Sequence, residues 1–215
     1  MEHKGRSFDG AASGASYLFW TRIFGFTPSF YANAAEKPDF PPGVTSSNII
    51  VLDLGCGPGP LSFALARKLE AGATIYGLDI SSDQIAYAQQ HSHSYPCSLT
   101  FSVASMDEIP FCDSYFDLVM TSMALHETPP SVRRKAIAEA ARVLKPEGRF
   151  LLIDWCRPRI GLLSLIWLPM LLVARGKDRD NWDNVYKTLC EQQNMTLADD
   201  RYINSIARRQ VFIKK

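Results

Sequence analysis

Residues 49–59 read Ile-Ile-Val-Leu-Asp-Leu-Gly-Cys-Gly-Pro-Gly, so an apolar run leads directly into a glycine-rich turn. Glycine lets the backbone turn tightly and lets a ligand approach the main chain where a Cβ would block it. A second apolar run, residues 74–78, ends in Asp79. A carboxylate at the carboxyl end of a strand suits the two hydroxyls of a ribose. The pairing predicts that an adenosine-containing ligand binds at the carboxyl edge of a parallel sheet.

The spacing of the glycines narrows the choice of ligand. The dinucleotide fingerprint has its third glycine five residues after the first, whereas here Gly55, Gly57 and Gly59 are followed by Pro60 at that position. This disfavours a nicotinamide-dependent dehydrogenase. No Lys-Ser or Lys-Thr pair follows the loop, which excludes a P-loop. An ordinary strand–turn–helix is the simpler alternative, but the glycines together with an acidic residue on each strand argue against it.

The composition indicates a globular protein without a strong charge. The chain has 215 residues, 47% hydrophobic and 21% charged, with a formal net charge of +1. One α/β domain is the default at this length, and the charge gives no support for nucleic-acid binding. The five cysteines lack C-x-x-C spacing, so neither a disulfide framework nor a metal site is expected. Residues 1–10 lack the apolar core of a signal peptide, and a cytoplasmic location is therefore predicted.

Strand-like and helix-like segments alternate along the chain. The expected strands are residues 49–54, 74–78, 99–103, 116–121, 149–154, 196–203 and 207–214, and the expected helices are 60–69, 82–91, 131–144 and 182–193. This alternation predicts an α/β fold, with a doubly wound, mostly parallel seven-stranded sheet and helices on both faces. Because only a short turn separates the last two strands, the final strand should run antiparallel.

The chain divides into two predicted parts. Residues 1–47 form an N-terminal helical extension or lid, in which residues 1–10 are expected to be loose and the aromatic stretch 17–30 to form one or two helices broken near Pro28. Residues 48–215 form the ligand-binding domain, which carries an apolar insertion at residues 156–181.

The core of that insertion, residues 160–174, reads IGLLSLIWLPMLLVA and carries no charge, with basic residues on both sides. It is shorter than the ~20 residues that a membrane span needs. A buried or lid helix is the favoured interpretation. A helix in peripheral contact with a membrane surface and an interface between copies of the chain are the alternatives.

Four later stretches match the motifs of one known family in order and spacing. They are Ser-Met-Asp-Glu-Ile-Pro-Phe (105–111), Asp-Ser-Tyr-Phe-Asp (113–117), Met-Ala-Leu-His (123–126) and Arg-Val-Leu-Lys-Pro-Glu-Gly-Arg (142–149). Together with residues 49–59, they resemble the class I S-adenosylmethionine-dependent methyltransferases, and within that class the quinone-biosynthesis C-methyltransferases and related small-molecule methyltransferases look most similar. The resemblance implies a Rossmann-like methyltransferase fold and S-adenosyl-L-methionine as cofactor.

The resemblance also implies which residues bind the cofactor: Asp53, Gly55, Cys56, Gly57, Gly59, Asp79, Ile80, Ser105, Met106 and Thr121. Asp79 would take the ribose hydroxyls, Ile80 and Met106 would meet the adenine, and Thr121 would meet the methionine end. Ser105 departs from the family, which usually has an aspartate there to accept from the adenine amino group. A neutral hydroxyl should form a weaker bond.

His126 is the candidate catalytic residue. It follows the fourth predicted strand, and the pKa of an imidazole suits a general base. The alternative is a histidine that only orients or packs on the cofactor. A base is needed only when the acceptor must lose a proton, because the sulfonium is already an activated methyl donor. We predict methyl transfer to a small, lipophilic acceptor, with a non-enzymatic S-adenosylmethionine-binding protein as the alternative.

Overall fold

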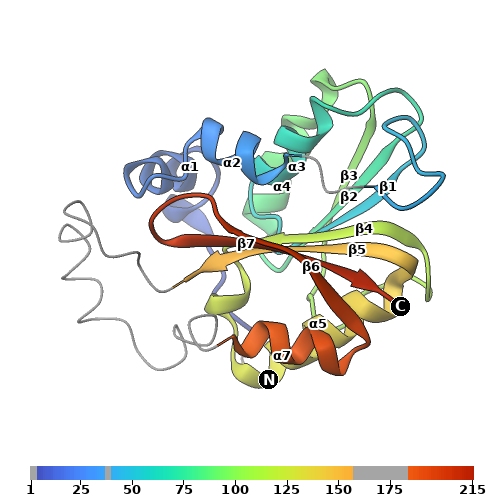
Figure 1. Ribbon diagram of the computed structural model, residues 1–215. Helices are drawn as coiled ribbons and strands as arrows, with labels where there is room; N and C mark the ends of the chain where they lie inside the picture. Colours follow the sequence, from blue (N-terminus) through green and yellow to red (C-terminus); the bar gives the residue numbers. More distant parts are fainter. Residues whose placement is uncertain (1–3, 37–39, 157–183) are drawn as a thin grey trace.

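The computed structural model describes residues 4–36, 40–156 and 184–215, and a seven-stranded sheet lies at the centre of this part of the chain (Figure 1). The strands are β1 (Ile50–Leu54), β2 (Thr74–Asp79), β3 (Ser98–Val103), β4 (Phe116–Ser122), β5 (Leu144–Trp155), β6 (Met195–Tyr202) and β7 (Ala207–Lys214). Their order is β3-β2-β1-β4-β5-β7-β6, and only the pairings of β7 are antiparallel. The predicted doubly wound, mostly parallel sheet with an antiparallel final strand is confirmed.

Helices cover both faces of the sheet (Figure 1). They are α1 (Gly14–Ile23), α2 (Pro28–Ala34), α3 (Pro60–Ala66), α4 (Ser82–Gln90), α5 (Pro130–Val143) and α7 (Val185–Gln192), with short 3-10 turns η1 (Gly10–Ala12), η2 (Ser92–Ser94) and η3 (Leu125–Glu127). Val51 packs with α2 and α3 in one core, and its neighbour Leu52 packs with α5 and α7 in the other. Successive strand residues point to opposite faces, so a strand covered on both sides reads as a continuous apolar run.

The sheet order places a crevice at one edge. The chain winds outward from β1 to β2 and β3 on one side, and then crosses to β4 and β5 on the other. The loops that leave β1 and β4 therefore diverge at the carboxyl ends of the strands, and open α/β sheets bind ligands at such a point.

The start of the fifth strand differs from the expectation. The helix before it, α5, ends at Val143, and β5 begins immediately, since Leu144 already pairs with Phe116. The register then shifts, and the next pair joins Leu118 to Arg149. Residues 145–148 thus form an irregular part of the strand, although their proline and glycine indicate a simple helix stop when the sequence is considered alone.

The N-terminal region also differs in part. Residues 4–9, expected to be loose, lie along the carboxyl edge of the sheet. The break between the first helices is where it was expected, because Thr27 caps α2 through a bond to the Phe30 amide, with Pro28 at the first helical position. The domain boundary at residues 47/48 stays a prediction. Nearly all of the predicted insertion, including residues 160–174, lies outside the described residues. No helix within the described ranges is both long and apolar enough to cross a membrane.

Candidate cofactor site

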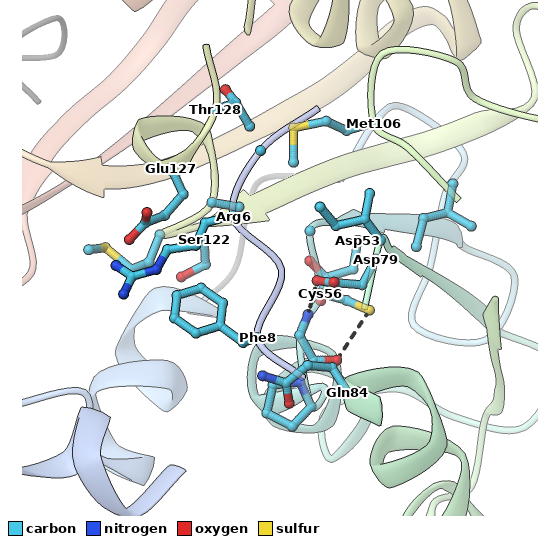
Figure 2. Close-up of a pocket in the computed structure, with 18 of the residues that line it drawn as sticks. Arg6, Phe8, Asp53, Cys56, Asp79, Gln84, Met106, Ser122, Glu127 and Thr128 are labelled. Carbon is cyan, nitrogen blue, oxygen red and sulfur yellow. Dashed lines mark hydrogen bonds between the residues drawn. The ribbon is translucent and has the colours of Figure 1, made fainter. Parts of the chain in front are cut away.

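A pocket with about 810 Å³ of space, open to solvent, lies at this edge of the sheet (Figure 2). The loop after β1, the ends of β2 and β4, the loop after β3 and the N-terminal region all contribute to its lining. Eight of the predicted cofactor residues belong to it: Asp53, Gly55, Cys56, Gly57, Asp79, Ile80, Ser105 and Met106. The other predicted residues, Gly59, Thr121 and His126, do not.

The glycine-rich loop is held tightly against the end of β2. The amides of Gly55 and Cys56 both donate to the carbonyl oxygen of Leu78, at 2.8 and 3.0 Å. Gly55 has a φ of 65°, and a Cβ at this position would lie 2.5 Å from the Cβ of Ala124. Glycine is therefore required here both by the backbone angle and by the close approach of the loop after β4.

Asp79 connects the loop to the second strand. Its Oδ2 accepts from the amide of Gly57 at 2.8 Å, and its Oδ1 accepts from the amide of Ser81 at 2.9 Å. Burial raises the pKa of the carboxyl, although these amides oppose the shift. Each carboxylate oxygen can accept a further bond, so the group retains capacity for the two ribose hydroxyls expected of it.

Asp53 is enclosed beneath the loop, with 1% of its surface exposed. Its Oδ2 accepts a hydrogen bond from the Ser62 hydroxyl at 2.7 Å. Burial raises its pKa to about 7; the Ser62 bond opposes this, and the charge of Asp79 adds to it. Asp53 thus joins β1 to α3 beneath the glycine-rich loop.

The loop after β3 forms another side of the pocket. The hydroxyl of Ser105 donates to Asp107 Oδ1 at 2.5 Å, so its proton is engaged while the oxygen keeps lone pairs that can accept. Ser105 can therefore act as the acceptor that the resemblance requires, but without charge. Asp107 is itself paired with Lys4 at 3.0 Å.

Two predicted residues support the pocket from outside its lining. Gly59 has a φ of 84° where α3 begins, and a Cβ there would lie 2.9 Å from the Phe63 ring. Thr121 is buried, and its hydroxyl donates to the carbonyl oxygen of Leu54 at 2.8 Å. Its neighbour Ser122 lines the pocket instead.

His126 lies behind the pocket in a hydrogen-bonded cluster. Its Nδ1 is 2.6 Å from Asp154 Oδ1, and its amide donates to Asp154 Oδ2 at 3.1 Å. The same carboxylate accepts from the Tyr186 hydroxyl at 3.2 Å. On the other side of the ring, Nε2 is 2.9 Å from Trp155 Nε1 and 3.4 Å from Glu127 Oε1.

The two neighbours of Nε2 favour different protonation states. The indole N–H can donate only to a neutral ring, whereas Glu127 favours a protonated one. Burial opposes the charge on the ring, but Asp154 and Glu127 outweigh it and raise the pKa of His126 to about 9. At neutral pH this environment favours the imidazolium, which holds no lone pair with which to accept a proton.

A buried arginine fixes the turn that carries His126. Arg133 is 1% exposed; its guanidinium donates to the carbonyl oxygens of Leu125 at 3.0 Å and Thr128 at 2.8 Å. The η3 turn is therefore held from α5, with Glu127 placed at the pocket.

The sequence predicted an N-terminal lid from the aromatic region, but it did not identify residues 4–8 as part of the pocket. Lys4, Gly5, Arg6 and Phe8 line it, and so do Tyr17 of α1 and Tyr31 of α2. Burial, with Asp79 and Glu127 nearby, raises the pKa of Tyr17 to about 12. The aromatic richness of residues 17–30 was the signal in the sequence for Tyr17, and Tyr31 directly follows that stretch, whereas nothing in residues 4–8 resembles a motif.

The matches to known proteins concentrate on the central part of the chain. Residues 51–148 match the family described as a methyltransferase domain. An uncharacterised methyltransferase of Synechocystis is 38% identical over 57% of this chain and 53% of its own length. The demethylmenaquinone methyltransferase of Lactiplantibacillus plantarum is 33% identical over 57% of this chain and 52% of its own length. A ubiquinone/menaquinone biosynthesis C-methyltransferase of Geotalea daltonii is 26% identical over 74% of this chain and 66% of its own. The chain thus spans about half to two thirds of these relatives.

Solved structures share the fold over most of the chain. Magnesium protoporphyrin IX methyltransferase of Synechocystis, solved with bound S-adenosylhomocysteine, has a TM-score of 0.61 and 19% identity, over 93% of this chain and 81% of its own. The [4+2]-cyclase SpnF has a TM-score of 0.64 and 16% identity, over 100% and 88%. The Rossmann-like methyltransferase fold is therefore confirmed, and the sequence matches show a methyltransferase domain of the class I S-adenosylmethionine-dependent type at residues 51–148.

Proposed function

We propose that the chain transfers a methyl group from S-adenosylmethionine to a small, lipophilic, quinone-like acceptor. The observation that carries the acceptor class is the aromatic lining of the pocket, to which Phe8, Tyr17 and Tyr31 contribute. Aromatic rings pack well against a flat aromatic acceptor. The names of two relatives, a demethylmenaquinone methyltransferase and a ubiquinone/menaquinone biosynthesis C-methyltransferase, agree with this class.

The proposed cofactor pose follows the order of the strands. The adenine lies by Ile80 and Met106, at the ends of β2 and β3, and the ribose hydroxyls bind Asp79. The methionine part then extends across the glycine loop of β1 toward Ser122 at the end of β4. In this pose the N-terminal region would act as a lid, which is supported by the pocket-lining positions of Lys4, Gly5, Arg6, Phe8, Tyr17 and Tyr31.

The proposed mechanism consists mainly of positioning. The acceptor atom must lie in line with the sulfonium methyl, and water must be excluded. The catalytic role predicted for His126 becomes a positioning role, because its high pKa favours the imidazolium and its ring lies outside the pocket lining. We propose Glu127, which lines the pocket 3.4 Å from His126 Nε2, as the group that takes a hydroxyl proton from the acceptor.

A methyl-transfer assay with labelled S-adenosylmethionine tests the acceptor class. The panel contains a naphthohydroquinol with a free ring carbon, simple phenols and amines. Transfer of the label to the naphthohydroquinol would support the proposal. The Glu127→Gln variant should then lower kcat far more than it lowers the affinity for S-adenosylhomocysteine. Transfer confined to the amines would refute a quinone-like acceptor.

The alternative is a protein that binds S-adenosylmethionine without methyl transfer. The [4+2]-cyclase that shares this fold supports this alternative, because its name describes chemistry other than methyl transfer. Tight cofactor binding with no transfer to any acceptor would support this alternative.

We also propose that the protein makes peripheral contact with a bilayer that holds the lipophilic acceptor. The predicted contact, residues 160–174, lies outside the described residues, but α1 and the residue after it expose a group of large apolar side chains: Phe19 60%, Trp20 58%, Ile23 61% and Phe24 48%. Residues 10–35 contain no Asp or Glu, so nothing in this stretch repels anionic headgroups. Vesicle flotation should fall for Trp20→Ser combined with Phe24→Ser. Unchanged flotation with loss of a dimer on size exclusion would indicate an interface between copies.

A further inference from the structure

The N-terminal strap, defined as residues 4–9, is pinned at both ends across the pocket. At one end Lys4 Nζ is 3.0 Å from Asp107 Oδ1. At the other, the Ser81 hydroxyl lies 3.1 Å from the carbonyl oxygen of Phe8 and 2.5 Å from Asp9 Oδ1. Between the anchors, a Cβ on Gly5 would come within 3.3 Å of the Thr128 side chain. The middle of the strap is therefore held against the pocket.

Arg6 lies in this middle part and extends its side chain into the pocket. Figure 2 shows its guanidinium on the side of Ser122 and Glu127, with Met106 at the opposite side. The guanidinium carbon lies 5.1 Å from the centre of the Phe8 ring, and this cation–π contact limits its movement. Within the described residues, Arg6 has no hydrogen bond or ion pair.

The charges around the pocket indicate which part of the cofactor a cation such as Arg6 would bind. Asp53, Asp79 and Glu127 line it; the two aspartates suit the ribose or the ammonium of the cofactor, and Glu127 is the base proposed for the acceptor. The methionine part also carries a carboxylate, which acidic groups repel. Of the cations in the lining, Lys4 is already paired with Asp107, so Arg6 is the cation left to meet it.

We infer that Arg6 binds the carboxylate of the methionine part of S-adenosylmethionine, so that the strap both covers the cofactor and recognises its charged end. The planar guanidinium matches a carboxylate with two parallel hydrogen bonds. The inference rests on the proposed cofactor pose and assigns to the chain a recognition residue outside the methyltransferase motifs.

The test compares two ligands that differ only in this carboxylate: S-adenosylhomocysteine and its decarboxylated analogue. Calorimetric titration gives the dissociation constant of each for wild type and for Arg6→Met. Wild type should prefer S-adenosylhomocysteine by about tenfold or more, as expected for a charge-assisted bond, and Arg6→Met should remove that preference by weakening S-adenosylhomocysteine alone. Arg6→Lys, which keeps the charge but loses the planar fork, should retain part of it.

Two control variants separate this role from simple damage to the strap or loss of charge. Lys4→Met removes the anchor between the strap and Asp107, and it should weaken the binding of both ligands by the same factor. Arg22→Met removes one charge from the exposed surface of α1 and should change neither affinity. An Arg6→Met protein that keeps the preference for S-adenosylhomocysteine, or binds both ligands equally more weakly, overturns the inference. Failure of wild type to bind either ligand refutes the cofactor pose itself, and the inference with it.

Discussion

Replacement of Asp79 by asparagine tests the centre of the site with almost no change in shape. The carboxylate accepts from the Gly57 amide at 2.8 Å and from the Ser81 amide at 2.9 Å. Asparagine has one oxygen, so its NH2 group must face one of these two amide donors. Loss of a hydrogen bond to a charged group costs about 1.5–3 kcal/mol. Burial already disfavours the Asp79 charge, as its raised pKa shows, and removing that charge offsets part of the cost. We therefore expect the free energy of unfolding to fall by about 1.5 kcal/mol, the lower end of the range.

The effect on the ligand should be larger than the effect on the fold. The carboxylate can serve both ribose hydroxyls, whereas an amide oxygen is the only acceptor of the variant. One lost charge-assisted bond corresponds to a dissociation constant for S-adenosylhomocysteine about tenfold higher or more. Calorimetry measures the affinity, and urea denaturation of the free protein measures the stability. Glu70→Gln makes the same change of charge at an exposed position and serves as control. A folded Asp79→Asn protein with wild-type affinity would refute the assignment of this carboxylate to the ribose.

Three other predictions concern the parts that support the site. The pKa of His126 is raised from 6.5 to about 9, so the folded protein holds a proton that the unfolded chain loses. The free energy of unfolding should therefore fall between these pH values, by up to roughly 1.4 kcal/mol per pH unit, and His126→Gln should flatten that slope in urea titrations. Gly77→Ala places a Cβ 2.3 Å from Phe101 Cδ1 and should destabilise the protein by about 1–3 kcal/mol; an unchanged denaturation midpoint would contradict this. Arg133→Met leaves buried carbonyl oxygens of the η3 region without their donor, so we expect the free energy of unfolding to fall by about 1–3 kcal/mol. Amide hydrogen exchange at residues 125–128 should also become faster. Unaltered exchange there would show that the turn is held by other contacts.

The sequence by itself determined the sheet and the glycine-rich loop that we propose binds the cofactor. Alternating apolar runs and amphipathic segments predict strands and helices from residues that are neighbours in the chain, and the αβ alternation then restricts the topology. The glycines that follow β1 and Asp79, the last residue of β2, are likewise local signals, since each stands at the end of a strand. Either Ser81 or Ser82 could be predicted as a helix cap for the same reason, and the structure shows that the Ser81 hydroxyl accepts from the Gln84 amide at 3.2 Å.

Only the tertiary structure decided which distant residues complete the pocket. The ion pair between Lys4 and Asp107 joins positions 103 residues apart, and the contact between His126 and Asp154 joins positions 28 apart. No periodic pattern in the sequence predicts such contacts, because they form only when the strap, the η3 turn and the strand ends meet at the same edge of the sheet. For the same reason the sequence placed Arg6 in a loose terminus and left His126 open between a base and an orienting residue, because their charges and burial depend on what the fold brings beside them.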